Sequence, residues 1–489
     1  MFVFNKPKIL KIMNTKKHIK TLRQSKVGFL SIVVAIFAMS FCAVEANSND
    51  SAKDPISLRI ELDRSILPAN KTEKAIVKIS LDGLRRESAE SRPPVNLVIV
   101  LDRSSSMSGD KIIQAKEAAI EALNRLAADD IFSLVTFDSN IETIIPATRV
   151  GNSKALESKI RRIEPRGMTA LFGGVTQGAS ELRKNIEDSR YIHRIILLSD
   201  GQANQGPRTA EELGRLGAAL VKEGISVTTV GLGLGYDEDL MTRLALRSDG
   251  NTYFVEGSSD LPRIFTAELG DVLNIVARRV VMKIDFPSDI RPIRFIGRDG
   301  HIEGQYAEIT LNQIYGGQEK YALIEVEIPA REENYECTIV NAKVVFEDPI
   351  SQKTSTLESK KSAKFSADYE VVVKSANHEV QTEYAKNIVA STEEEVILLV
   401  DAGKQEEAAK LMKDNASSLS KIADVYGVAS VLDISQDLEK NAESIEVVGY
   451  GTTAEEKTQN RKKMKANSSA IQNQQETSAV STSSQKNKK

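Results

Sequence analysis

The sequence predicts an α/β fold, in which a doubly wound, Rossmann-like sheet is inserted into a β-sandwich and followed by a helical region. Two observations carry this prediction. Between residues 96 and 276, apolar strand-like runs alternate with helical stretches, as in a parallel sheet covered by helices on both faces. On both sides of that segment, apolar and polar residues alternate one by one, which is typical of strands with one solvated face.

Residues 1–46 have the layout of a signal peptide. Residues 1–26 contain eight Lys and Arg and no Asp or Glu. The 16-residue apolar run Val27–Cys42 follows, and the small residue Ala46 lies directly before the expected cleavage site. We therefore expect an exported protein of the periplasm, the cell envelope or the extracellular space. The alternative is an uncleaved N-terminal anchor, although the run is slightly short for a membrane span. No later run has that length, so we expect no membrane span after cleavage.

The charge of the remaining chain argues against a nucleic-acid partner. Beyond residue 46 there are 57 Lys and Arg against 67 Asp and Glu, whereas nucleic-acid binders normally carry a basic face. Cys337 is the one cysteine left after cleavage, so no internal disulfide can form. Its strand-like setting, "YECTIV", predicts a buried structural thiol.

The two β-rich segments are residues 53–94 and 277–376. The first contains "ISLRIELD" and "KAIVKISLDG", too few strands to fold alone, and the second runs from "RRVVMKIDF" to "EVVVK". We therefore expect both to build one discontinuous sandwich. Residues 377–445 are predicted to be helical, with a turn at "DAGK". Residues 450–489 are polar and nearly free of apolar side chains, which predicts a disordered tail.

The segment 95–276 supplies the α/β domain. Its predicted strands are "NLVIVLD", "IFSLVTFD", "IETIIPA", "RIILLSD", "ISVTTVG" and "TYFVE". The clearest helix follows the first strand and has one broad apolar face, made of Ile112, Ile113, Ala115, Ala119, Ile120 and Leu123.

Two of these strands end in an acid. Asp102 ends the first strand and Asp200 the fourth, and in a sheet of order 3-2-1-4-5-6 these strands are neighbours about 4.8 Å apart. Ser104 and Ser106 add hydroxyls two residues apart. Two close carboxylates repel unless a cation or proton separates them. Oxygen ligands suit Mg²⁺, with Mn²⁺ or Ca²⁺ as alternatives.

Together with "GMTALFGG" and "LLSDGQANQG", the Asp-x-Ser-x-Ser pattern resembles the von Willebrand factor type A domain and its metal-ion-dependent adhesion site. The resemblance covers about residues 95–275, and it departs from the family at Ser105, where glycine is most common. It implies five metal ligands, which are Asp102, Ser104, Ser106, Thr169 and Asp200. It also implies a vacant coordination position for a carboxylate of a protein or peptide partner.

We therefore expect a metal-dependent recognition or adhesion module of the cell envelope and no enzyme. A catalytic metal site normally needs a base beside the bound water, and His193 begins the strand that Asp200 ends. The alternative is a structural component of an envelope complex, in which the metal only stabilises the loops. Arg103 is expected to be solvated at the rim or to steer an acidic partner. Lys111 is expected to be an ordinary solvated residue of the first helical turn.

Overall fold

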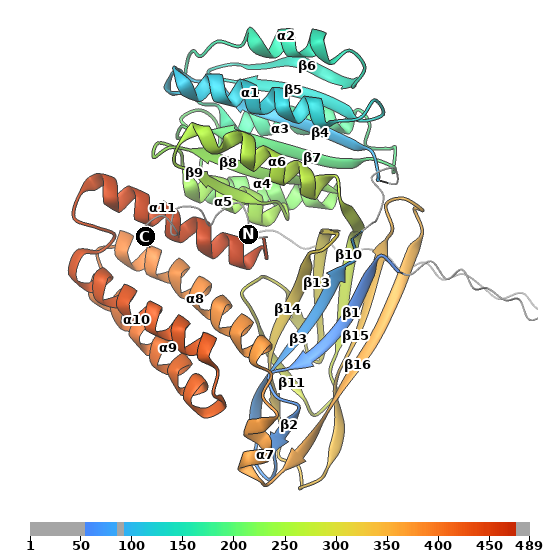
Figure 1. Ribbon diagram of the computed structural model, residues 1–489, viewed down its shortest axis with the longest axis vertical. Helices are drawn as coiled ribbons and strands as arrows, with labels where there is room; N and C mark the ends of the chain where they lie inside the picture. Colours follow the sequence, from blue (N-terminus) through green and yellow to red (C-terminus); the bar gives the residue numbers. More distant parts are fainter. Residues whose placement is uncertain (1–53, 86–91, 476–489) are drawn as a thin grey trace, which may run out of the picture. The chain divides into compact units, whose positions relative to one another are not determined.

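The computed structural model describes residues 54–85 and 92–475 of the chain (Figure 1). The predicted signal peptide, residues 1–46, lies outside the described residues. The described residues form three β-sheets, helices that cover one of these sheets, and a C-terminal group of helices. In this part of the chain no helix is both long and apolar enough to cross a bilayer.

A six-stranded sheet is the centre of the α/β domain. Its strands are β4 (Val95–Asp102), β5 (Ile131–Phe137), β6 (Ile141–Arg149), β7 (Ile192–Ser199), β8 (Ile225–Leu232) and β9 (Thr252–Val255). They lie in the order β6-β5-β4-β7-β8-β9, and only β6 runs antiparallel to its neighbour. The predicted order 3-2-1-4-5-6 is therefore confirmed. It places the carboxyl ends of β4 and β7 side by side.

Helices cover both faces of this sheet. One face carries α1 (Asp110–Arg125), α2 (Ser153–Arg161) and α6 (Leu261–Val272). The other face carries α3 (Leu171–Arg183), α4 (Ala210–Lys222) and α5 (Glu238–Arg247). The parallel strands between them are consequently buried on both sides and consist of continuous apolar runs.

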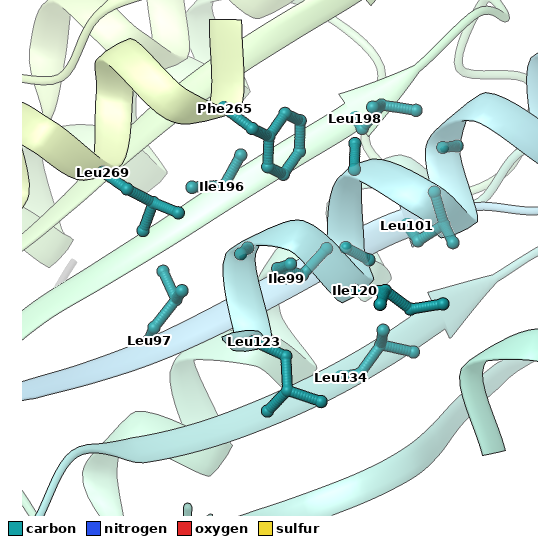
Figure 2. Close-up of a cluster of buried hydrophobic side chains, with 14 of the residues drawn as sticks. Leu97, Ile99, Leu101, Ile120, Leu123, Leu134, Ile196, Leu198, Phe265 and Leu269 are labelled. Atoms are coloured by element: carbon teal, nitrogen blue, oxygen red, sulfur yellow. The ribbon is translucent and has the colours of Figure 1, made fainter. Parts of the chain in front are cut away.

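The central strand β4 shows how the sequence fills the two layers. Leu97 and Ile99 point into the cluster formed with α1 and α6 (Figure 2), whereas Val98 and Val100 point into the cluster with α3. Burying each such side chain contributes about 2 kcal/mol to folding. Ile113 was expected on the packed face of α1, but it is 50% exposed. One residue beyond Ile112, it is rotated by about 100° around the helix axis, away from the sheet.

Two further sheets form the sandwich. One has the order β1-β3-β14-β11 and the other the order β12-β13-β10-β15-β16-β2. Their strands are β1 (Ile56–Leu62), β2 (Ile66–Pro68), β3 (Glu73–Gly83), β10 (Ile275–Asp285), β11 (Arg291–Ile296), β12 (His301–Glu303), β13 (Tyr306–Tyr315), β14 (Glu319–Ile328), β15 (Glu336–Glu347) and β16 (Thr354–Ser366). Both sheets contribute side chains to one apolar core.

The sandwich is discontinuous in sequence. Strand β3 precedes the α/β domain and pairs antiparallel with β14, which follows that domain. Strand β2, which also precedes that domain, pairs in parallel with β16, which follows it. The α/β domain is therefore connected between strands of the same sandwich.

The run "EVVVK" was predicted as a strand, and this prediction is wrong. It lies in helix α7 (Tyr369–Lys374), because the carboxylate of Asp368 accepts hydrogen bonds from the backbone N–H groups of Glu370 and Val371. Such a cap favours a helix over the strand tendency of three valines. Cys337 in β15 is half-buried, which corrects the expectation of a fully buried thiol.

The C-terminal region begins with three packed helices, α8 (His378–Asp401), α9 (Gln405–Tyr426) and α10 (Ala429–Val448). The predicted turn at "DAGK" separates α8 from α9, and Gly403 adopts a positive φ there.

The prediction of disorder for residues 450–489 is wrong for residues 454–472. They form helix α11 (Ala454–Gln472), which contacts α5, α8 and β9. Thr453 and Glu456 form a capping box at its start. The Lys462 side chain is 2% exposed, and its ammonium donates to the carbonyl of Tyr236 and pairs with Glu238. This helix packs largely through paired polar groups, so a count of apolar residues underestimates its order.

We predict that Lys462→Met destabilises the protein by about 2 kcal/mol, because Glu238 would lose its buried ammonium partner and keep only the more exposed guanidinium of Arg461. Urea unfolding followed by circular dichroism measures this change. Lys457→Met is the control, since Lys457 lies exposed on the same helix. Equal stabilities of the two variants would contradict the prediction.

A second prediction concerns His193, the second residue of strand β7. Burial lowers its pKa to about 4, with the charges of Arg278 and Arg279 adding to the effect. The unfolded chain binds this proton near pH 6.5, so stability is complete above that pH and falls as the pH decreases toward 4. Between pH 7 and pH 5 we expect this one residue to remove about 2 kcal/mol.

Comparing wild type with His193→Gln by urea unfolding at both pH values isolates this contribution. The loss on acidification should be smaller in the variant by about that amount. An identical loss in both proteins would show that His193 is not responsible.

Candidate metal centre

The two acids singled out in the sequence lie at the same edge of the α/β sheet. Asp102 is the last residue of β4, and Asp200 follows the last residue of β7. Because β4 and β7 are neighbouring parallel strands, their carboxyl ends meet. Both side chains are buried, with 0% and 1% of their surface exposed. The structure therefore brings two carboxylates together in a region with little water.

Asp102 is held by two uncharged donors. Its Oδ1 accepts from the backbone N–H of Ser104 at 2.8 Å, and its Oδ2 accepts from the hydroxyl of Ser199 at 2.5 Å. Burial raises the pKa of Asp102 to about 6; these hydrogen bonds oppose the rise, and the charge of Asp200 adds to it. The environment thus disfavours the unpaired negative charge, and a nearby cation would offset that effect.

The hydroxyls of the first loop connect the two acids. Ser104 Oγ lies 2.9 Å from Ser106 Oγ, and Ser106 Oγ donates to Asp200 Oδ1 at 2.8 Å. Ser106 is solvent-exposed, whereas Ser104 is buried. The oxygen cluster therefore reaches from the buried sheet edge to the protein surface.

Thr169, at the start of the segment leading into α3, borders the same space. A methyl group added to Gly201 would lie 3.0 Å from Thr169 Oγ1, 3.6 Å from Ser106 Oγ and 3.7 Å from Asp102 Oδ2. Oxygens of the first and second predicted segments therefore converge on one position beside Gly201 of the third, and Ser106 Oγ also reaches the Asp200 carboxylate. The structure brings all five predicted site residues together.

Asn204 holds the second and third segments in register. Its side-chain Oδ1 accepts from the backbone N–H of Thr169 at 2.8 Å, and its backbone N–H donates to the Thr169 carbonyl at 3.1 Å. Sequence reasoning did not single out Asn204 or Ser199. A polar residue directly before the acid in "LLSD" and an amide in "GQANQG" were the available signals.

The expectation that Arg103 is solvated or steers a partner is wrong. Arg103 is 5% exposed, and its guanidinium donates to Asp138 at 2.7 Å and to Glu142 at 2.8 Å. Arg166 donates to the same Asp138 carboxylate at 3.0 Å. Asp138 therefore joins the first loop to the second. Arg103 is committed to this internal ion pair, which braces the loops.

Lys111 also departs from its predicted role as an ordinary solvated residue. Its ammonium pairs with Asp200 Oδ2 and lies 3.4 Å from the Ser106 carbonyl, although 37% of its side chain remains exposed. The first turn of α1 begins beside the oxygen cluster, so a long side chain at this position reaches the acid. Sequence periodicity alone does not show this contact.

The donor set agrees with a hard cation. Two carboxylates and three hydroxyls are oxygen ligands of the kind that Mg²⁺, Mn²⁺ and Ca²⁺ take, whereas softer metals prefer imidazole or thiolate. Within the described ranges, no three His, Cys, Asp or Glu side chains gather as a metal-binding group. A cation here would consequently be balanced by only the two acids.

Comparison with known proteins agrees with this architecture. The sequence profile of the von Willebrand factor type A domain matches residues 96–267. An uncharacterized protein of Synechocystis sp., sll0103, is 24% identical over 56% of this chain and 66% of its own length. Inter-alpha-trypsin inhibitor heavy chain H3 of Mus musculus is 29% identical over 34% of this chain and 20% of its own. This chain thus spans less than two thirds of either relative.

Solved structures extend the likeness beyond the α/β domain. A von Willebrand factor type A protein from Catenulispora acidiphila has a TM-score of 0.59 at 16% identity, over 80% of this chain and 97% of that one. The ArnB paralog VWA2 from Sulfolobus acidocaldarius has a TM-score of 0.51 at 18% identity, over 80% and 99%. At these identities the likeness concerns the fold. Residues 96–267 of this chain are a von Willebrand factor type A domain, a class of module that commonly serves in metal-dependent protein interaction.

Proposed function

We propose that the centre holds a divalent cation, chiefly Mg²⁺, and that this cation binds an acidic group of a partner protein or peptide. The proposed ligands are Asp102, Ser104, Ser106, Thr169 and Asp200. The observation that carries the proposal is the convergence of oxygens from the first and second segments on the space beside Gly201, next to the Asp200 carboxylate that Ser106 contacts. Mn²⁺ and Ca²⁺ are the alternative ions, since both take the same oxygen ligands.

The chemistry of the donor set supports recognition of a carboxylate. A divalent cation balanced by two acids and otherwise held by neutral hydroxyls and water remains a strong electron-pair acceptor, which favours an anionic oxygen as its last ligand. The solvent exposure of Ser106 leaves this side of the centre within reach of a partner.

Binding is proposed rather than catalysis. The two acids that border the centre would both serve as ligands, which leaves neither free as a base. His193 lies at the opposite end of β7 from Asp200, and its ring is hydrogen-bonded to Asn96 at 3.2 Å. The domain class, in which interaction modules are typical, agrees with this choice.

We also propose that the protein acts outside the cytoplasm, in the periplasm or elsewhere in the cell envelope. The basic residues 1–26 and the apolar run Val27–Cys42 support export. The competing function is a structural role in an envelope complex, in which the metal only stabilises the loops.

Gly201→Ala tests whether the space beside Gly201 holds the ion. The added methyl group would occupy that space while leaving all five oxygen-bearing side chains in the protein. We expect divalent-ion affinity, measured by isothermal titration with Mg²⁺ and Mn²⁺, to fall at least about tenfold, with an unchanged circular dichroism spectrum.

Gly151→Ala is the matched control, because a methyl group there would contact nothing within 4 Å. Unchanged metal affinity in Gly201→Ala, or an equal loss of affinity in the control, would show that the ion does not bind beside Gly201.

Partner binding is tested by retention of envelope proteins on the immobilised protein. We expect retention in Mg²⁺ that disappears with EDTA and with Asp102→Ala, because both remove the cation. Converting the carboxylates of the retained protein to amides with a carbodiimide should also abolish it.

The same experiment separates recognition from the structural role. Retention that survives EDTA, together with a lower melting temperature in EDTA, would contradict recognition and favour loop stabilisation. Loss of retention with the melting temperature largely preserved would favour recognition.

A further inference from the structure

Lys111 is a charged residue that lies at the centre but does not belong to the proposed set of ligands. It is the second residue of α1, and its ammonium pairs with Asp200 Oδ2 while also lying 3.4 Å from the Ser106 carbonyl. Its Cε lies 3.9 Å from the position that a Cβ on Gly233 would take, in the turn after β8. The ammonium thus lies between the Asp200 carboxylate and the Ser106 carbonyl.

The hydrogen bonds of the two acids show why this contact matters. Asp102 accepts from the Ser104 backbone and the Ser199 hydroxyl, and Asp200 Oδ1 accepts from the Ser106 hydroxyl. These three donors are neutral. Among the partners that the structure gives these carboxylates, Lys111 alone carries a charge. One ammonium therefore partly balances two buried acids.

We propose that Lys111 is the tethered counter-ion of the metal-free centre and that it competes with the divalent cation for Asp200. This inference rests on the proposed function, because it concerns the affinity of the same centre. A bound divalent cation and the ammonium repel each other, so the ion must displace Lys111 from Asp200 or bind against its charge.

Two opposite effects follow for a variant without the ammonium. The metal-free protein is less stable, since two buried carboxylates then lie together with neutral donors only. The divalent ion binds more tightly, because it no longer competes with a cation that is already attached to the protein. A residue of this kind sets the concentration of free divalent ion at which the centre fills.

Lys111→Met removes the charge and keeps a side chain of similar length. Isothermal titration of the full chain with Mg²⁺ and with Mn²⁺ should show affinity increased about tenfold or more over wild type. Melting followed by circular dichroism in EDTA should show a lower melting temperature, and saturating Mg²⁺ should raise it by more than in wild type. Lys111→Arg, which keeps a cation, should bind the ions within about threefold of wild type.

Lys116→Met is the matched control. Lys116 lies on the same helix, and its ammonium donates to the carbonyls of Arg161 and Ile163, away from the centre. The substitution Lys116→Met removes the same charge from the domain but at a distance from the centre, so it should change metal affinity by less than about threefold.

The possible outcomes are distinct. Unchanged or weaker metal binding by Lys111→Met, or an equal increase in Lys116→Met, would overturn the counter-ion role while leaving the metal centre intact. Absence of ion uptake by wild type and by Lys111→Met alike would overturn the proposed function and this inference with it. Uptake by Lys111→Met but not by wild type would support the competition directly.

Discussion

The burial of two like charges at neighbouring strand ends is the constraint on which the centre depends. Asp102 and Asp200 are carried there by β4 and β7, the strands between which the order of the sheet reverses. Desolvation raises the pKa of Asp102 to about 6, so the fold holds this carboxylate where its charge is disfavoured. The Ser199 hydroxyl and the Ser104 backbone N–H offset part of that cost, and the ammonium of Lys111 pairs with the neighbouring Asp200. A divalent cation would offset it more completely.

The loops that supply the oxygens are held by interactions of their own. The Arg103 carbonyl accepts from the backbone of Arg166, and the Ser105 backbone donates to the Gly167 carbonyl, so the first and second loops are connected along their main chains. The buried Asp138 carboxylate adds ion pairs to both arginines. Because these contacts form within the protein itself, the proposed ligands are held in place without an ion, which would reduce the entropy lost if one binds.

The C-terminal helix α11 also contacts the α/β domain. Lys462 of α11 contacts the carbonyl of Tyr236, and the Tyr236 ring packs against Gly231 at the end of β8. The neighbouring Gly235 approaches the Asp200 carbonyl so closely that a Cβ would lie 2.7 Å from it. The turn after β8 thus contacts the third loop of the centre on one side and the C-terminal helix on the other. Folding of the C-terminal region and support of the centre therefore share this turn.

The sequence by itself determined the class of fold, the strand order of the α/β domain and the five oxygen-bearing residues. A buried strand can be recognised from its apolar run, and the acid that ends it follows directly in the sequence. Local patterns are therefore enough to find both. It did not determine the partners of long charged side chains. Arg103 and Lys111 were expected to be solvated, and Lys462 lies in the segment expected to be disordered. Each is paired with an acid.

Those pairings join residues far apart in the chain, and a long side chain can reach several positions, so only the packed structure decides between them. Helix α11 shows the same limit, because it has few apolar residues and its buried Lys462 is paired with Glu238 and Tyr236 of another domain. The five proposed ligands could thus be named from the sequence, whereas the pairing of Lys111 with Asp200 beside them could be found only in the fold.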